Sequence, residues 1–232
     1  MIRPVMASPR DLLRLPRSFY VRPTLVVARQ LVGKFLVRID GPDTYIGRIV
    51  ETEAYQGSRD PASHAYRGRT KRNDVMFRRG GHLYVYFTYG KHFCCNVVSR
   101  EEGIGHAVLI RAVEPRCGLE TMARNRQSPP GSTIGLCNGP AKICQAFGIG
   151  REDNGADLCG DAVWIGRQRG RGRTVKVCRS PRIGISTARS FPWRFFEAGN
   201  PHVSRSRPAT TKKPGGLDSS ASSPYDSPSI LS

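Results

Sequence analysis

Two carboxylates and a tyrosine alternate along one short segment of the chain, IVETEAY at residues 49–55. If this segment is a β-strand, then Ile49, Glu51, Glu53 and Tyr55 share one face. Neighbouring carboxylates beside a phenol are residue types that can perform general acid–base chemistry. A solvated strand face would show the same pattern, and for an isolated segment that is the more common explanation.

A single arginine interrupts the apolar segment HAVLIRAVEP at residues 106–115. On a strand, Arg111 shares a face with Val113 and other apolar residues, so we expect its guanidinium to be partly buried. A buried guanidinium needs a carboxylate partner to offset its desolvation, and Glu51 and Glu53 are the obvious candidates. Two interpretations stay open here, a structural ion pair and a catalytic site.

A third segment, HLYVYFTYG at residues 82–90, is rich in tyrosine. With a strand period of two, Tyr84 and Tyr86 share one face, and Tyr89 follows out of phase just before Gly90. Aromatic rings presented in this way are suited to stacking on nucleic-acid bases.

The chain has a strongly basic composition, with 37 Lys and Arg against 18 Asp and Glu in 232 residues and a formal net charge of +19. Such a surface attracts polyanions by releasing their counterions, so nucleic acid is the expected partner. Basic residues concentrate in a loop at residues 56–81 and in a run at residues 166–182. The loop suits binding of phosphates, although a solvated loop would look similar. The run is consistent with a flexible arm that follows the backbone of a nucleic acid and equally with a charged hairpin loop.

Seven cysteines are an odd number, and they form no C-x-x-C pair with a matching second pair or histidine partner. This favours reduced core residues over a disulfide framework or a metal site. No apolar run approaches the roughly 20 residues of a membrane span, and the N-terminal segment lacks the apolar centre of a secretory signal. We therefore expect a soluble protein of the cytoplasm, or of the nucleus in a eukaryote, that associates with nucleic acid, uses no metal or cofactor and contacts no membrane.

Local patterns divide the chain into a folded domain at residues 1–203 and a Ser/Pro-rich tail at residues 204–232, which we expect to be disordered. Strands are predicted at residues 34–39, 45–55, 82–90 and 106–115. One helix is predicted from a cap at Thr24 to Gly33, and a second has Asn138 as N-cap, Pro140 in its first turn and Gly148 as its end. The fold class is α+β, a single mixed domain with a central, mainly antiparallel curved β-sheet and flanking helices.

Five blocks occur in register along the chain: RIVETEAY, SHAYRGRTKRNDVMF, LYVYFTYGKHFCCN, AVLIRAVEP and LCNGPAKICQAF. Together they closely resemble the alkyladenine (3-methyladenine) DNA glycosylase family, strongly over residues 17–150 and more loosely over residues 150–203. The resemblance implies a monomer that flips alkylated or deaminated purines out of double-stranded DNA and hydrolyses the N-glycosidic bond, leaving an abasic site. It also implies a monofunctional enzyme without lyase activity, since no amine nucleophile matches.

The resemblance further assigns catalytic roles to individual positions. Glu53 matches the general base that activates a water, and Arg111 and the backbone N–H of Ile183 match the other contacts of that water. We expect Arg111 to lower the pKa of Glu53 and so keep this carboxylate ionised. Tyr89 matches the wedge that enters the duplex in place of the flipped nucleotide.

Five further positions match the family's base-binding pocket. Tyr55, His64 and Tyr86 match the residues that sandwich the extruded base, with the main chain near His64 reading its edge. Asn96 matches the position that crowds the exocyclic amine of normal guanine, and Leu109 matches another residue of the lining.

A non-enzymatic, basic nucleic-acid-binding protein is the alternative from a different functional class. Its tyrosines would stack on bases, but it would not need a buried carboxylate facing those bases. The convergence of Glu53, Arg111, Tyr55 and Tyr86 on one pocket therefore discriminates between the two hypotheses.

Overall fold

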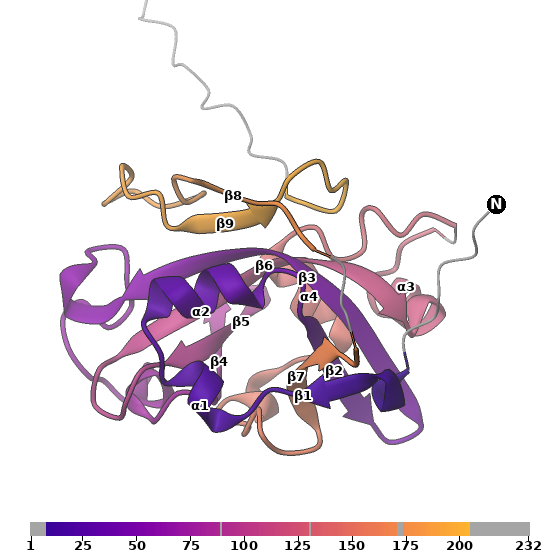
Figure 1. Ribbon diagram of the computed structural model, residues 1–232, viewed down its shortest axis with the longest axis horizontal. Coiled ribbons are helices and arrows are strands. Elements are labelled where there is room, and N and C mark those ends of the chain that lie inside the picture. Colours follow the sequence, from indigo (N-terminus) through magenta and orange to yellow (C-terminus); the bar gives the residue numbers. More distant parts are fainter. Residues whose placement is uncertain (1–7, 89, 130, 171–173, 205–232) are drawn as a thin grey trace, which may run out of the picture.

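The computed structural model describes residues 8–88, 90–129, 131–170 and 174–204. It contains one antiparallel sheet with helices packed against it (Figure 1), which confirms the predicted α+β class. The strands are β1 (Leu12–Arg14), β2 (Phe35–Asp40), β3 (Asp43–Gln56), β4 (Leu83–Thr88), β5 (His92–Ser99), β6 (His106–Cys117), β7 (Val163–Gln168), β8 (Val177–Ser180) and β9 (Arg194–Glu197). The α-helices are α1 (Arg17–Tyr20), α2 (Thr24–Leu31), α3 (Leu119–Asn125) and α4 (Pro140–Phe147).

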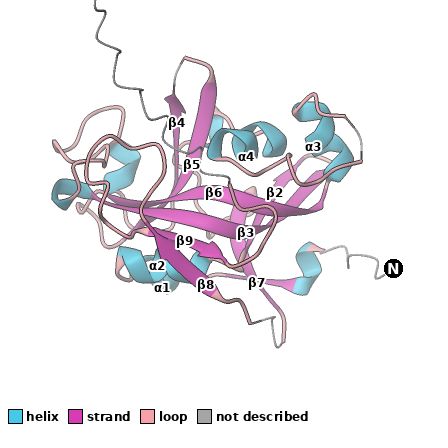
Figure 2. Ribbon diagram, turned by 90° about the horizontal axis from the view of Figure 1, so that it is seen from above, coloured by secondary structure: helices cyan, strands magenta, loops and turns pink. Residues whose placement is uncertain are grey.

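The sheet has the strand order β1-β7-β2-β3-β6-β5-β4, and β9 joins β3 to β8. The long strand β3 pairs with β2 in its first part and with β9 at residues 51–53. Because β5 pairs with β6 only over residues 96–99, the β4–β5 hairpin projects away from the rest of the sheet, as Figure 2 shows. This arrangement leaves room for a cavity beside the hairpin.

A β-bulge interrupts the pairing of β3 with β6 and changes which residues share a face. The register shifts on both sides of Glu51, which leaves Val50 and Arg111 outside the regular ladder. Ile49 and Val113 consequently lie in the main apolar core. The predictions that Ile49 shares a face with Glu51, and Val113 with Arg111, are therefore wrong, because a bulge reverses the alternation of a strand.

The start of α2 also differs from the prediction. Thr24 is the first helical residue, its N-cap is Pro23, and no side chain caps this end. The hydroxyl of Thr24 instead contacts Nδ1 of His106 at 2.8 Å and accepts a hydrogen bond from Ser99 at 3.1 Å. The helix is held to the sheet by Thr52, whose hydroxyl donates to the Ala28 carbonyl at 2.8 Å.

The helix α4 begins at Pro140 and ends at Gly148 in the left-handed conformation, both as predicted. Its N-cap, however, is Gly139. No side chain caps this end, and the side chain of Asn138 accepts a hydrogen bond from Lys142 at 2.7 Å.

Two sequence features remain, the basic run at residues 166–182 and the Ser/Pro-rich tail. The basic run at residues 166–182 is not a hairpin loop, because β7 pairs with β1 and β2 whereas β8 pairs with β9. Residues 205–232 of the predicted tail lie outside the described residues, whereas Ser204 is buried with the domain. In the part of the chain that the structure describes, no helix has the length and apolar character needed to cross a bilayer.

Candidate active site

A cavity of about 520 Å³ opens between the β4–β5 hairpin, β6, the loop after β3 and the segment 183–187. Its volume lies within the range of roughly 300 to 1,000 Å³ that is typical of small-molecule sites. Seven of the predicted site residues line it: Tyr55, His64, Tyr86, Asn96, Leu109, Arg111 and Ile183. Segments that are far apart in the chain therefore supply one site.

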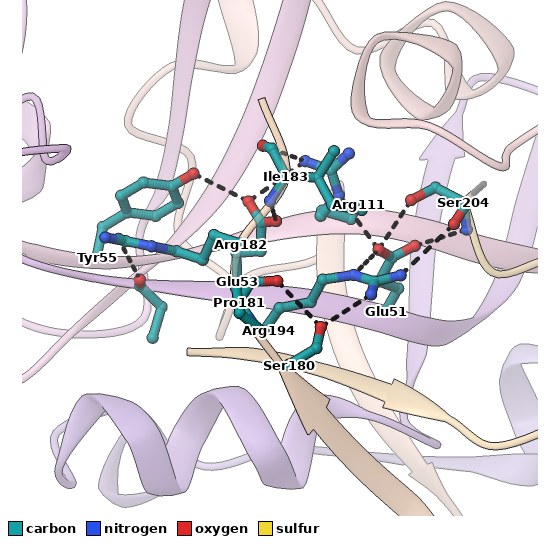
Figure 3. A network of polar contacts seen from close by, with 11 residues as sticks. Glu51, Glu53, Tyr55, Arg111, Ser180, Pro181, Arg182, Ile183, Arg194 and Ser204 are labelled. Carbon is teal, nitrogen blue, oxygen red and sulfur yellow. Dashed lines mark hydrogen bonds and ion pairs between the residues drawn. The ribbon is translucent and has the colours of Figure 1, made fainter. Parts of the chain in front are cut away.

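Glu53 lies directly behind this lining, and its side chain is fully buried. Oε1 accepts a hydrogen bond from the backbone N–H of Ile183 at 2.7 Å, and Oε2 accepts one from the Tyr55 hydroxyl at 2.9 Å (Figure 3). Nη1 of Arg111 is 3.3 Å from Oε2. All three partners line the cavity, so the carboxylate is separated from it by a single layer of groups.

Arg111 is placed between two carboxylates. Its Nε is 3.3 Å from Oε1 of Glu51 and its Nη1 is 3.3 Å from Oε2 of Glu53. Nη1 also donates to the Ile183 carbonyl at 3.4 Å. The predicted pairing of this arginine with the glutamates of β3 is therefore confirmed.

The electrostatics of Glu53 differ from the prediction. Desolvation by burial raises the pKa of Glu53 above its ordinary value. The Arg111 charge and the hydrogen bonds from Ile183 and Tyr55 oppose this rise, and the Glu51 charge adds to it. Arg111 thus acts in the predicted direction, but burial has the larger effect. Burial, followed by the neighbouring Glu53 charge, also raises the pKa of Tyr55, which keeps this phenol a neutral donor.

Aromatic side chains form one wall of the cavity. The rings of His64 and Tyr86 meet edge to face with centroids 4.5 Å apart, and Tyr84, which also lines the cavity, stacks on Tyr86 at 5.6 Å. Tyr84 also contacts Nδ1 of His64 through its hydroxyl at 3.0 Å, which fixes the orientation of the imidazole. Burial lowers the pKa of His64, so this ring is neutral at neutral pH.

The rest of the predicted pocket is held by backbone contacts. Asn96 and Leu109 are cross-strand partners on β5 and β6, and the Asn96 amide donates to the Tyr84 carbonyl at 3.1 Å. The loop that carries His64 is tied down by Asn73, whose amide donates to the His64 carbonyl at 2.8 Å. Hydrogen bonds to backbone carbonyls therefore hold this part of the cavity wall in place.

Sequence reasoning missed a buried ion pair beneath the site. Arg182 contacts both carboxylate oxygens of Asp60 at 2.5 and 2.8 Å and donates to the Ala54 carbonyl at 2.9 Å. Its guanidinium also lies 4.6 Å from the centre of the Tyr55 ring. The sequence placed Arg182 in a basic run and Asp60 in a polar loop, and no local pattern links residues 122 positions apart.

Tyr89, the predicted wedge, lies outside the described residues, so its role stays a prediction.

Glu51, Arg194 and Ser204 form a second polar network beside Arg111. Only Glu51 among them was considered from the sequence.

The sequence is also similar to those of known proteins. A sequence model of the methylpurine-DNA glycosylase (MPG) family matches residues 18–201. A relative from Chlorobium luteolum is 45% identical over 197 residues, which cover 84% of this chain and 99% of that protein. One from Burkholderia cenocepacia is 46% identical over 210 residues, covering 90% and 99%, and one from Desulfitobacterium hafniense is 44% identical over 201 residues, covering 82% and 98%. All three bear the name "Putative 3-methyladenine DNA glycosylase". The chain therefore belongs to the methylpurine-DNA glycosylase family.

Proposed function

We propose that this DNA glycosylase extrudes a damaged purine, such as 3-methyladenine, from duplex DNA into the cavity and hydrolyses its N-glycosidic bond with a water activated by Glu53. The observation that carries the proposal is the buried Glu53 carboxylate, anchored by Tyr55, Arg111 and Ile183 at the back of an aromatic-walled cavity. The product would be an abasic site in the DNA.

Extrusion is needed because the glycosidic bond of a stacked base is out of reach, and it costs a few kcal/mol. Stacking on an aromatic ring returns roughly 1 to 3 kcal/mol per base, which offsets that cost. Tyr55, His64 and Tyr86 supply aromatic faces at the cavity. Purines that carry a positive charge after alkylation gain cation–π attraction that normal bases lack.

The same site suits hydrolysis of the extruded nucleotide. Departure of the base leaves an oxocarbenium-like sugar, which a carboxylate stabilises while it removes a proton from the attacking water. A water that enters from the cavity meets Arg111 and Ile183 before it reaches Glu53, because these two residues belong to the lining. General-base assistance of this kind contributes about 10² to 10⁴ in rate.

A water nucleophile also accounts for the monofunctional activity that we propose. In the described part of the chain, no lysine lines the cavity, so a Schiff base with the sugar has no amine there. We assign selection against normal guanine to Asn96, and Leu109, its cross-strand partner, is assigned to the pocket lining. We assign the wedge role to Tyr89 and expect the protein to act as a monomer.

The decisive experiment compares Glu53→Gln with the unmodified chain on duplexes that contain hypoxanthine or ethenoadenine. Hot alkali then exposes the abasic sites. We expect Glu53→Gln to abolish base release while lesion-DNA binding is kept, because glutamine retains the shape but cannot accept a proton. Glu101→Gln, at an exposed ion pair with Arg79, is the matched control and should cleave normally. If Glu53→Gln excises as fast as this control, the mechanism is wrong.

The alternative, a passive nucleic-acid-binding protein, has less support. A binding platform gains nothing from a fully buried carboxylate behind its aromatic residues, because burying this charge is costly. Tyr55, Tyr86 and Arg111 line one cavity, and Glu53 is bonded to Tyr55 and Arg111 behind that lining, an arrangement that supports an enzyme. The alkali assay separates the two hypotheses, since a passive binder leaves no abasic site.

A further inference from the structure

Glu51 is a second buried carboxylate next to the site, and the proposed mechanism gives it no role. It lies two residues before Glu53 on β3, and its side chain is fully buried. Neither glutamate belongs to the cavity lining, but Glu53 is bonded to three lining residues, whereas Glu51 meets the lining at Arg111 and otherwise contacts Arg194 and Ser204. Any contribution to the reaction must therefore pass through a neighbouring residue.

The Glu51 carboxylate is held by the C-terminal part of the domain, as Figure 3 shows. Oε1 accepts hydrogen bonds from Nε of Arg194 at 2.5 Å and from the Ser204 hydroxyl at 2.8 Å, and Oε2 accepts one from the Ser204 N–H at 2.7 Å. Arg194 also donates to the Ser180 hydroxyl at 3.0 Å, which ties β9 to the end of β8. Charge-assisted bonds of this length fix the carboxylate firmly.

Arg111 faces this fixed carboxylate from the site. Its Nε forms an ion pair with Glu51 at 3.3 Å without hydrogen-bond geometry, and its Nη1 donates a hydrogen bond to Glu53 at 3.3 Å. Because a guanidinium is planar and rigid, the attraction of two of its nitrogens to different carboxylates favours one orientation. The β6 ladder alone does not do this, since Arg111 is the residue that the bulge leaves unpaired.

We propose that Glu51 is a positioning residue: held by Arg194 and Ser204, it orients the Arg111 guanidinium toward Glu53 and the cavity. The proposal rests on the proposed function of Glu53. By this proposal Ser204 helps to hold Arg111 in place through Glu51, although it is 153 positions from Glu51 in the sequence.

The test is excision under single-turnover conditions, measured with full-length Glu51→Gln across a range of pH. We expect the rate to fall about 10- to 100-fold, because small misplacements of a catalytic group have effects of this size. Lesion-DNA affinity should be unchanged, since Glu51 does not reach the cavity. The acid limb of the rate should move to higher pH, because a displaced Arg111 no longer lowers the pKa of Glu53, and this effect is larger than that of losing the like charge of Glu51.

The matched control is Glu197→Gln. Glu197 is also a buried carboxylate beside an arginine, 2.6 Å from Arg48, and it belongs to β9. We expect this variant to keep its rate and its acid limb even if it loses thermal stability. If Glu51→Gln does not fold, Ser204→Ala replaces it. This variant removes only the hydroxyl contact, and we expect a several-fold slower rate with unchanged affinity.

The proposal is overturned if Glu51→Gln keeps its rate and acid limb, or if Glu51→Gln and Glu197→Gln slow excision only in proportion to their unfolded fractions. If Ser204→Ala is the variant measured, an unchanged rate overturns it. Glu53→Gln is included in the same series. Should Glu53→Gln excise normally, the proposed function itself fails, whereas failure of the Glu51 variant alone removes only the positioning role.

Discussion

Removal of the arginine in the buried Arg182–Asp60 pair should destabilise the protein strongly. Both side chains are fully buried, and Arg182→Leu leaves the Asp60 carboxylate without its cation. Removal of one partner of a buried pair costs about 3 to 5 kcal/mol. For a domain of roughly 200 residues each kcal/mol lowers the Tm by about 2 to 4 °C, so we expect a drop of about 6 to 20 °C.

Thermal unfolding followed by circular dichroism measures this drop. Arg79→Leu is the surface control, because its pair with Glu101 is more than half exposed on both sides and is worth at most about 1 kcal/mol. Asp60→Asn combined with Arg182→Leu should lose less than Arg182→Leu alone, since no charge is then left buried and unpaired. A Tm drop for Arg182→Leu no larger than that of Arg79→Leu would refute this reasoning.

Two further predictions concern the site itself. Because burial raises the pKa of Glu53, the excision rate should rise with pH over a limb that lies above the ordinary value of 4.5, and a pH–rate profile that is flat there contradicts this. The stability that Glu53 contributes is present below 4.5 and is lost as pH rises through its folded pKa, so Glu53→Gln should flatten that part of the Tm profile. Tyr86→Leu should weaken binding of lesion DNA about 5- to 150-fold in titrations, the equivalent of 1 to 3 kcal/mol of stacking, and unchanged affinity would exclude Tyr86 as a stacking wall.

Short-range patterns were sufficient for much of the fold. The alternation of residues 45–55 and 106–115 predicted the two central strands, β3 and β6. Pro140 and Gly148 marked the ends of α4 correctly, because the lack of an N–H and the freedom to adopt a positive φ are properties of single residues. The caps at Thr24 and Asn138 were predicted wrongly: Thr24 contacts His106 of a distant strand, and Asn138 lies one residue before the actual N-cap and bonds to Lys142 of the same helix.

The sequence by itself determined the chemistry of the site: the glutamate, the arginine, the tyrosines and the basic charge are all readable from residue type and spacing. Only the tertiary structure decided how they are oriented and supported. A bulge beside Glu51 changes the face of the strand on which Arg111 lies. Arg182 contacts Asp60, 122 positions away in the sequence, and Ser204 contacts Glu51, 153 positions away. Local periodicity carries no information about such partners, because contacts between distant segments form only when the whole sheet has folded.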